Sequence, residues 1–279
     1  MTSPLAADAI AEDFARDGVV WLQAALSARE MAIVEQAYDY RLAHLTERAA
    51  WLYPNPGTTF LTDMTNKAVW HDEPFVRLLT ETSLGEIARR CFGGGDVWFY
   101  YEQIFLKEGA SRRTPWHQDS SYLPVGGPAQ ARTWIPLDRV PVEDALEFVA
   151  GSHRGPTYNT SSFSEQDDTE PYDLTIDLPR LPDIEANRGD WPIVSWALSP
   201  GDVLAFHPGL LHGGAATRSG GRRRTLTLVT VGEDARFEPR YSADTPAEVG
   251  ADGDGGFAGL RPGDRFRLPD FIAMPVKRG

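Results

Sequence analysis

The chain has 279 residues, of which 42% are hydrophobic and 24% charged, a balance typical of a globular protein with a substantial core. The formal net charge is −13, and such an acidic surface repels phosphate backbones and anionic lipid, which argues against nucleic acid or a membrane as partner. One cysteine, Cys91, excludes an intrachain disulfide and fits a reducing compartment.

The first residues predict no targeting segment. "MTSPLAADAIAEDFARDG" contains acidic residues and no long apolar run, unlike a signal peptide. No stretch reaches the roughly 18 apolar residues that span a bilayer. We therefore expect a cytoplasmic protein.

Residues 1–96 are predicted to be mostly helical. A helix is expected over 5–16, and "GVVWLQAAL" (18–26) has the pattern of a short strand. Ser27, with Glu30 three residues later, forms a capping box and predicts a second helix.

Two prolines and a glycine predict a loop over 51–60. "DEPFVRLLTETSLGEIARRC" then has helical spacing and ends at three consecutive glycines.

The pattern changes to strands at Val97. Aromatic and β-branched residues fill "VWFYYEQIFLK", and similar short segments follow: "ARTWIPLDRV", "ALEFVAGSH", "GDVLAFHPGLLH" and "RRRTLTLVTVG". Helices first and strands later predict an α+β fold with a β-sandwich or barrel core. We expect one domain over 1–279, with its core at 97–232, a long insertion loop at 155–190 and an irregular tail at 233–279.

"TPWHQDSSYLP" places His117 and Asp119 two residues apart. In a strand such residues point to the same face, so the pair offers a nitrogen and an oxygen to one point. That arrangement serves a metal, a proton relay or a hydrogen-bonded turn.

A third candidate ligand is His212. Two imidazoles and one carboxylate form the facial triad of non-heme iron(II) oxygenases, which leaves three adjacent coordination positions for a 2-oxo acid and dioxygen. His212 is followed by a Gly/Ser turn and, eleven residues on, by Arg223. His207 is the rival third ligand, and structural roles are expected for His44, His71 and His153.

The chain resembles the phytanoyl-CoA dioxygenase family, a branch of the iron(II)/2-oxoglutarate-dependent oxygenases. The resemblance covers roughly residues 12–232, through "DGVVWLQAALSARE", "YYEQIFLKEG", "TPWHQDSSYLP", "TWIPLD", "ALEFVAGSHRG" and "SPGDVLAFHPGLLHGGAATRSGGRRRTLT". It implies a double-stranded β-helix, the jelly-roll or cupin-like core, flanked by N-terminal helices.

The family pattern implies the site residues. It puts the iron ligands at His117, Asp119 and His212. It also puts the arginine that pairs with the far carboxylate of 2-oxoglutarate at Arg223, with Thr225 on the same strand face.

Other positions are implied near the cosubstrate. Gln103 and Trp134 fall where relatives line its site, although Trp134 also suits plain barrel core. For Lys107 we expect a surface acid rather than the cosubstrate. Arg222 and Arg224 are expected to face solvent or surface carboxylates.

The chain departs from the family in two places. "VEDALEFVAGSH" lacks the Asn-Gly that often precedes this segment, and Gly214 replaces a common serine near the cosubstrate. Neither change touches the ligands. Candidate substrate-pocket residues are aromatic: Trp51, Tyr53, Phe60, Trp70, Tyr122, Trp191 and Trp196.

The resemblance therefore implies a dioxygenase that uses Fe(II), 2-oxoglutarate and O2 to hydroxylate a small organic molecule. Two rivals use the same scaffold: a metal-dependent isomerase or hydrolase without 2-oxoglutarate, and a non-catalytic binding protein. Arg223 and Thr225 argue against the first rival, and the intact triad argues against the second. A CoA thioester is disfavoured, because Arg112 and Arg113 are the only basic pair near the metal strand.

Overall fold

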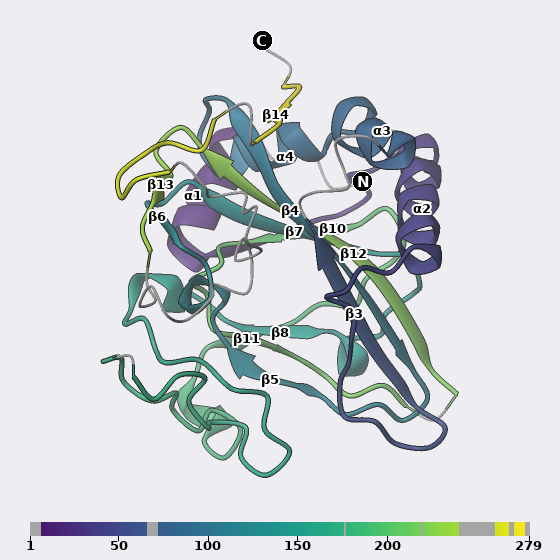
Figure 1. The fold of residues 1–279 in the computed structure, drawn as a ribbon, viewed down its shortest axis with the longest axis vertical. Helices are drawn as coiled ribbons and strands as arrows, with labels where there is room; N and C mark the ends of the chain where they lie inside the picture. The colour runs from purple at the N-terminus through teal and green to yellow at the C-terminus, as the bar shows by residue number, and fades with distance from the viewer. Residues whose placement is uncertain are drawn as a thin grey trace.

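The protein is described by a computed structural model over residues 7–65, 72–175, 177–218, 220–239, 260–267 and 271–276. Its core is a jelly roll of two facing antiparallel sheets, and helices cover the outer face of the larger sheet (Figure 1). The α+β class and the jelly-roll core expected from the sequence are confirmed. None of the helices in these ranges is long and apolar enough to cross a membrane.

The two main sheets contain most of the strands. In spatial order, the large sheet consists of β1 (Val19–Leu22), β10 (Val203–Phe206), β7 (Gln130–Pro136), β12 (Arg222–Gly232), β4 (Val97–Glu108), β3 (Thr59–Thr65) and β2 (Ala50–Trp51), with β14 (Ala273–Met274) also paired to β4. The small sheet consists of β5 (Thr114–His117), β11 (His212–Gly214), β8 (Leu146–Val149) and β9 (Ile193–Val194). A two-stranded sheet joins β6 (Val125–Gly126) to β13 (Arg236–Phe237).

The helices are α1 (Ala7–Asp17), α2 (Ala28–Ala43), α3 (Glu73–Glu81) and α4 (Leu84–Cys91). The capping box at the start of α2 is confirmed: the Ser27 hydroxyl accepts from the backbone of Glu30, whose carboxylate accepts from the backbone of Ser27. Strand alternation separates the two faces of the large sheet. Leu226 and Leu228 of β12 pack under the helices, which leaves the residues between them to face the small sheet.

The predicted loop over 51–60 is wrong in part. Trp51 lies in β2, and β3 begins at Thr59 and pairs with β4 along its whole length, from Thr59 opposite Glu108 to Thr65 opposite Glu102. The prolines and Gly57 mark a turn, but the β-branched and apolar residues after that turn belong to a strand. The large sheet therefore draws strands from the first 96 residues as well.

The insertion and the tail are largely irregular but packed. Within 155–190, isolated bridges join Asn159 to Arg180 and Ser161 to Pro171. In the described part of the tail, Phe266 and Phe271 are fully buried beside Tyr100. His71 and Trp70, both named from the sequence, lie outside the described residues.

Candidate functional site

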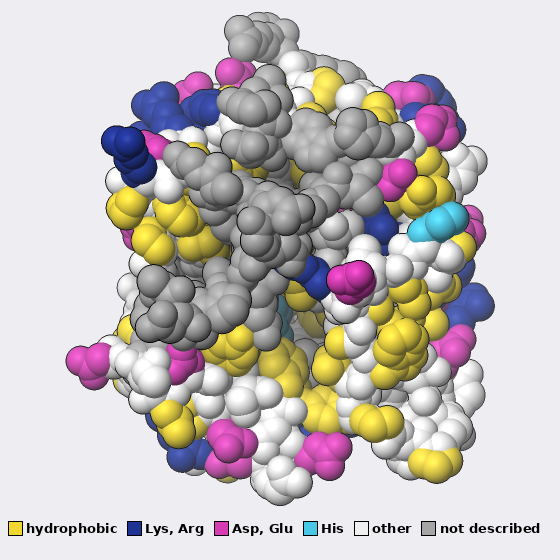
Figure 2. Space-filling model, in the orientation of Figure 1, with side chains coloured by type: hydrophobic (Ala, Val, Ile, Leu, Met, Phe, Trp, Pro, Cys, Tyr) yellow, Lys and Arg dark blue, Asp and Glu magenta, His cyan; other side chains and the backbone are white. Residues whose placement is uncertain are grey.

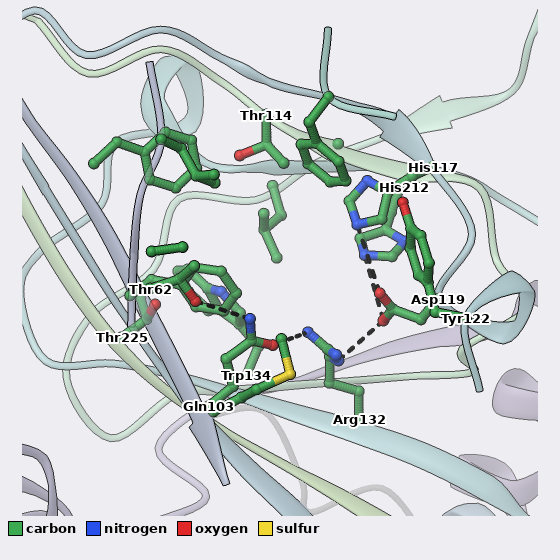
Figure 3. Close-up of a pocket in the computed structure, with 18 of the residues that line it drawn as sticks. Thr62, Gln103, Thr114, His117, Asp119, Tyr122, Arg132, Trp134, His212 and Thr225 are labelled. Atoms are coloured by element: carbon green, nitrogen blue, oxygen red, sulfur yellow. Dashed lines mark hydrogen bonds and ion pairs between the residues drawn. The ribbon is translucent and has the colours of Figure 1, made fainter. Parts of the chain in front are cut away.

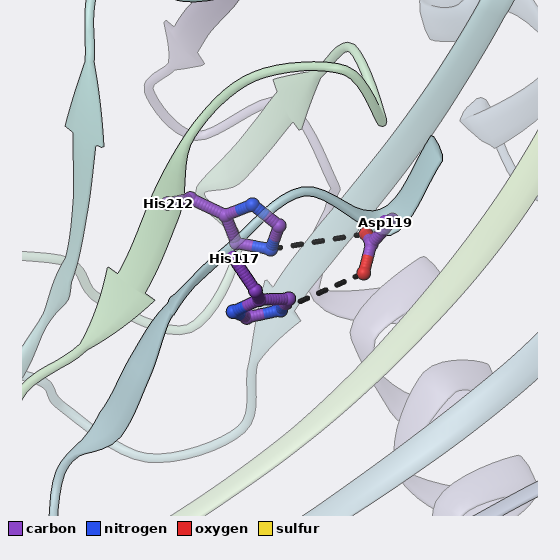
Figure 4. A group of neighbouring side chains, drawn as sticks. All are labelled: His117, Asp119 and His212. Atoms are coloured by element: carbon purple, nitrogen blue, oxygen red, sulfur yellow. Dashed lines mark ion pairs between the residues drawn. The ribbon is translucent and has the colours of Figure 1, made fainter. Parts of the chain in front are cut away.

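His117 and His212 are cross-strand neighbours in the small sheet. His117 is the last residue of β5, His212 is the first of β11, and the two occupy the same register position. Their ring centroids are 4.1 Å apart, and both side chains are buried (Figure 4). Antiparallel pairing thus brings together two imidazoles that are 95 positions apart in the chain.

Asp119 reaches the same point from a turn rather than from a strand. β5 ends at His117, Gln118 stays extended, and Asp119 begins a short 3-10 helix (Asp119–Ser121). Asp119 Oδ1 lies 3.6 Å from His117 Nε2, and Oδ2 lies 3.8 Å from His212 Nε2. The extended Gln118 preserves the alternation on which the sequence argument depended, although the strand itself has ended.

Both histidines present an unprotonated nitrogen to Asp119. His117 Nδ1 lies 2.8 Å from the Pro115 carbonyl and His212 Nδ1 lies 2.9 Å from that of Leu210; a carbonyl only accepts, so each Nδ1 carries the proton. Burial lowers the pKa of His117, and burial together with the neighbouring His117 lowers that of His212 to about 3. Neutral imidazoles oriented by backbone carbonyls are ready to bind a metal through Nε2.

The carboxyl group of Asp119 is ionised. Burial alone would raise its pKa, but Arg132, His212 and His117 outweigh that effect and lower the pKa below the usual value. One ligand atom from each of His117, Asp119 and His212 lies within 4.8 Å of the others. Two neutral nitrogens and one anionic oxygen fit a divalent iron ion.

His207, the rival ligand, lies elsewhere. Its ring faces His153 at 5.3 Å between centroids, and its Nδ1 accepts from the backbone N–H of Gly209. The structure therefore places His212 and not His207 beside His117.

Arg223 and Lys107 form a pair of buried cations in the same cavity. They are opposite each other in the register of β12 and β4, so their side chains point the same way. Arg223 donates to the Asp144 carbonyl, and among the described residues neither cation has a carboxylate within ion-pair distance. Two buried cations without an acidic partner constitute a site for an anion.

The expectation that Lys107 pairs with a surface acid is wrong. Its side chain is buried and donates to the Arg112 carbonyl (2.9 Å) and the Thr114 hydroxyl (3.1 Å), with its Nζ 3.9 Å from the centre of the Phe60 ring. Burial, together with the charge of Arg223, holds its pKa well below the usual value. The prediction failed because β3 covers this end of β4, and sequence reasoning had missed β3.

The other cations of β12 behave as expected. Arg222 and Arg224 contact the Asp138 carboxylate at 3.1 and 3.0 Å, outside the cavity. Strand alternation thus separates the surface arginines from Arg223.

The remaining predicted residues line the same cavity. Thr225, Gln103 and Trp134 all face it, and Trp134 also belongs to the core between the sheets. A side chain at Gly214 would place its Cβ 3.1 Å from Thr114 Oγ1 and 3.4 Å from Arg223 Nη2. Glycine there leaves room for the Thr114 hydroxyl beside the cation pair.

Sequence reasoning missed Arg132. This buried residue of β7 lies two positions before Trp134, so the two share a strand face, and that parity could have identified it. Its Nε is 3.0 Å from Asp119 Oδ2, and its Nη1 donates to Gln103 Oε1 at 3.1 Å (Figure 3).

The cavity has a volume of about 790 Å³, and hydrophobic side chains border a hollow near the middle of the face in Figure 2. Of the described aromatic candidates, Phe60 and Tyr122 line it, whereas Trp51, Tyr53, Trp191 and Trp196 do not. Five aromatic residues that were not predicted also line it: Tyr101, Phe105, Phe163, Tyr172 and Phe206. Phe163 and Tyr172 come from the insertion, so this loop forms part of the cavity wall.

A family model described as phytanoyl-CoA dioxygenase (PhyH) matches residues 14–225. L-proline trans-4-hydroxylase of Streptomyces griseoviridis is 29% identical over 172 residues. That match covers 57% of this chain and 63% of the relative, so it spans less than two thirds of the relative's length.

Solved structures share the fold. The non-heme alpha ketoglutarate dependent epimerase SnoN from nogalamycin biosynthesis is 23% identical, with a TM-score of 0.72 over 99% of this chain and 98% of that one. The carbocyclase SnoK from the same biosynthesis is 21% identical, with a TM-score of 0.70 over 98% of this chain and 100% of that one. A second SnoN structure contains Fe3+, alpha ketoglutarate and nogalamycin RO.

Proposed function

The chain belongs to the phytanoyl-CoA dioxygenase family, and from that premise we propose that it is an iron(II)- and 2-oxoglutarate-dependent dioxygenase that hydroxylates a small organic molecule. The observation that carries the proposal is the meeting of two features in one cavity. The His117–Asp119–His212 cluster offers a metal site, and the Arg223–Lys107 pair offers an anion site. In a 2-oxo diacid, the keto acid end can bind the metal and the far carboxylate can bind the cation pair.

The three ligands would hold the metal and leave some of its coordination positions open. His117, Asp119 and His212 would supply three ligands to iron, which leaves three of six positions open. Iron(II), once bound there with 2-oxoglutarate, supplies the chemistry that activates dioxygen and oxidises an unactivated C–H bond. The protonated Nδ1 of His117 and that of His212 donate to the Pro115 and Leu210 carbonyls, so both imidazoles would act as neutral ligands through Nε2.

The cation pair acts by binding the far carboxylate of 2-oxoglutarate. The guanidinium of Arg223 offers two parallel donors, and the hydroxyls of Thr225 and Thr114 lie at the same end of the cavity. Burial makes these contacts strong, because little water competes for the carboxylate. Gln103 and Trp134 complete the wall of this proposed site.

The proposed substrate is a small molecule. The named relatives are a hydroxylase of L-proline and two proteins of nogalamycin biosynthesis, an epimerase and a carbocyclase. Aromatic side chains on the cavity wall suit apolar parts of a substrate. Hydroxylation is the simplest outcome, and epimerisation or ring closure would use the same residues.

The rival functions explain less of the cavity. An isomerase or hydrolase that needs only a metal has no use for the buried Arg223 and Lys107. A binding protein has no need for two imidazoles with their Nδ1 protons committed and their Nε2 atoms free. We further propose that residues 1–279 form one oxygenase domain of a cytoplasmic protein that binds neither nucleic acid nor membranes.

The test is a succinate-release screen against a compound library, with iron(II) and 2-oxoglutarate present. We expect one chemical class to stimulate succinate release, and expect the release to vanish in a His117→Ala variant. Stimulation that persists in that variant, or a metal-loaded protein that never consumes 2-oxoglutarate, would contradict the proposal.

A further inference from the structure

Arg132 is a buried cation next to the carboxylate of the proposed metal ligand. Its Nε lies 3.0 Å from Asp119 Oδ2, and only 6% of its surface is exposed. The two neighbouring histidines are neutral, so Arg132 is the only charged group within ion-pair distance of Asp119 among the described residues. A metal at the triad would therefore share this carboxylate with a guanidinium.

The guanidinium is fixed by a chain of hydrogen bonds across the cavity floor. Its Nη1 donates to Gln103 Oε1, and the Gln103 amide donates at 2.8 Å to the hydroxyl of Thr62 (Figure 3). Its Nη2 donates to the hydroxyl of Tyr101. Strands β3 and β4 thus hold Arg132 where it is, so it acts on Asp119 from a set position.

Without Arg132, the two oxygens of Asp119 would be nearly equivalent. Oδ1 faces His117 Nε2 at 3.6 Å and Oδ2 faces His212 Nε2 at 3.8 Å, so both could bind one metal. The closest contact of Arg132 with the carboxylate is to Oδ2. Arg132 therefore distinguishes Oδ2 from Oδ1.

We propose that Arg132 is a positioning residue that reserves Oδ2, so that Asp119 binds iron through Oδ1 alone. The inference rests on the proposed function. If the carboxylate bound through both oxygens, it and the two histidines would together fill four of the six coordination positions. Too few would then remain for both ends of the keto acid group and for dioxygen.

The arrangement also has an electrostatic cost. A buried guanidinium beside the ligand repels a divalent cation, and Coulomb interactions are strong where little water screens them. Removing Arg132 should therefore strengthen metal binding while it weakens 2-oxoglutarate binding. A residue that merely supported the fold would weaken both, so the opposite signs identify the positioning role.

The experiment is anaerobic calorimetry of Co(II) binding to the wild type and to Arg132→Met, first without and then with 2-oxoglutarate. We expect Arg132→Met to bind Co(II) about tenfold more tightly, equivalent to about 1.4 kcal/mol, and its Co(II) form to bind 2-oxoglutarate at least about tenfold more weakly. The visible spectrum of bound Co(II) should also change, because the coordination number changes. Arg132→Lys keeps the charge and should retain a Co(II) affinity close to that of the wild type.

Two further variants control the result. Tyr101→Phe is nearly isosteric, loosens Arg132 without removing its charge, and should weaken 2-oxoglutarate binding by a smaller factor. Arg222→Met, on the surface, should change neither constant. Unchanged or weaker Co(II) binding by a folded Arg132→Met would overturn the inference, as would unchanged 2-oxoglutarate binding by Tyr101→Phe if Arg132→Met does not fold. Failure of the wild type to bind Co(II) would overturn the proposed function itself.

Discussion

Two backbone carbonyls determine what the histidines of the site can do. The carbonyls of Pro115 and Leu210 each accept a hydrogen bond from Nδ1–H of the histidine two residues further on. This leaves the unprotonated Nε2 of each histidine as the atom that can bind a metal. Gln118, between the two ligands of the first strand, is anchored by its side chain to Gly209, Pro156 and Tyr158. The residue after His117, the loop before His212 and the start of the insertion are thereby joined at the site.

Loss of the cation pair should weaken cosubstrate binding selectively. Truncating one member of a buried charge pair costs about 2–5 kcal/mol, so Arg223→Met should lower 2-oxoglutarate affinity at least about tenfold. Lys107→Met should also lower the affinity for 2-oxoglutarate. Calorimetry should show metal affinity unchanged in both, and the exposed control variant Arg222→Met should resemble the wild type. Equal 2-oxoglutarate affinities for Arg223→Met and the wild type would disprove the proposed role of the cation pair.

The carboxylate of Asp119 should exclude halide from the reaction. With this ligand, two histidines, the keto acid group and dioxygen, all six positions are used, so product formation should not depend on chloride or bromide. Asp119→Gly should abolish hydroxylation or leave weak halide-dependent chemistry, because it removes a ligand and a compensating charge. Mass spectrometry of the products provides the readout, and a chlorinated product from the wild type would contradict the prediction.

At the residue scale, the sequence predicts which side chains belong to the site better than it predicts which residues those side chains contact. His117, Asp119, His212 and Arg223 were identified from the spacing of short motifs and from the family resemblance, and the structure places all four on one cavity. The partners of Lys107 and Arg132 depend on which strand lies opposite. Strand β3 pairs alongside Lys107 and covers it, and Arg132 contacts Asp119 only because the two sheets face each other.

Of the three α-helices whose N-caps lie within the described residues, only α2 has a side-chain cap hydrogen bond. Glu30 Oε2 accepts from the backbone and hydroxyl of Ser27, while Oε1 accepts from the backbone and hydroxyl of Ser83, just before α4. Burial alone would raise the pKa of Glu30, but these hydrogen bonds outweigh it and lower the pKa from 4.5 to about 2. One carboxylate thus joins the starts of two helices.

Glu30→Gln should destabilise the fold in a pH-dependent way. An amide cannot accept at both ends, so we expect the free energy of unfolding to fall by about 1 kcal/mol at neutral pH, a typical value for a lost cap. Because the folded pKa is depressed, this contribution is present above about pH 4.5 and lost as the pH falls towards about 2. Urea unfolding across that range measures it, with Glu35→Gln as the exposed control in the same helix. A constant difference between pH 7 and pH 2.5 would contradict the assignment.

The predictability of the elements follows from how local their signals are. The capping box of α2 and the aromatic run of β4 are local, and both elements form where expected. β3 was missed because "TTFLTDMT" is short and follows two prolines and a glycine, which predict a loop. The role of the insertion as a cavity wall depends on long-range ion pairs, such as Arg112 with Asp168 (2.6 Å) and Arg113 with Glu185 (3.0 Å), that no local pattern reveals.

The whole molecule combines an acidic exterior with a basic interior site. The chain carries a net charge of −13, yet the described residues that line the cavity include Lys107, Arg132 and Arg223 against one acid, Asp119. Burial between the two sheets reduces the screening of these cations by water, so the cavity attracts a dianion such as 2-oxoglutarate. Net charge alone argues against nucleic acid as a partner, but it does not reveal the basic lining of the cavity.

Labelled dioxygen should follow the reaction of the complete enzyme. With a substrate from the screen, mass spectrometry should find one label in succinate and some label in a product that gained one oxygen atom. Exchange with water lowers the second value, so a parallel reaction in labelled water is the control. Succinate free of label would rule out a 2-oxoglutarate-dependent dioxygenase.

The central claim is that one cavity holds iron at His117, Asp119 and His212 and 2-oxoglutarate between that iron and Arg223. Anaerobic calorimetry of 2-oxoglutarate binding to the iron(II)-loaded protein tests it most directly. We predict one molecule bound per chain, with binding greatly weakened when iron is removed or when His212 is changed to Ala, and retained in His207→Ala. Absence of binding to the loaded wild type, or binding indifferent both to iron and to His212, would contradict the account.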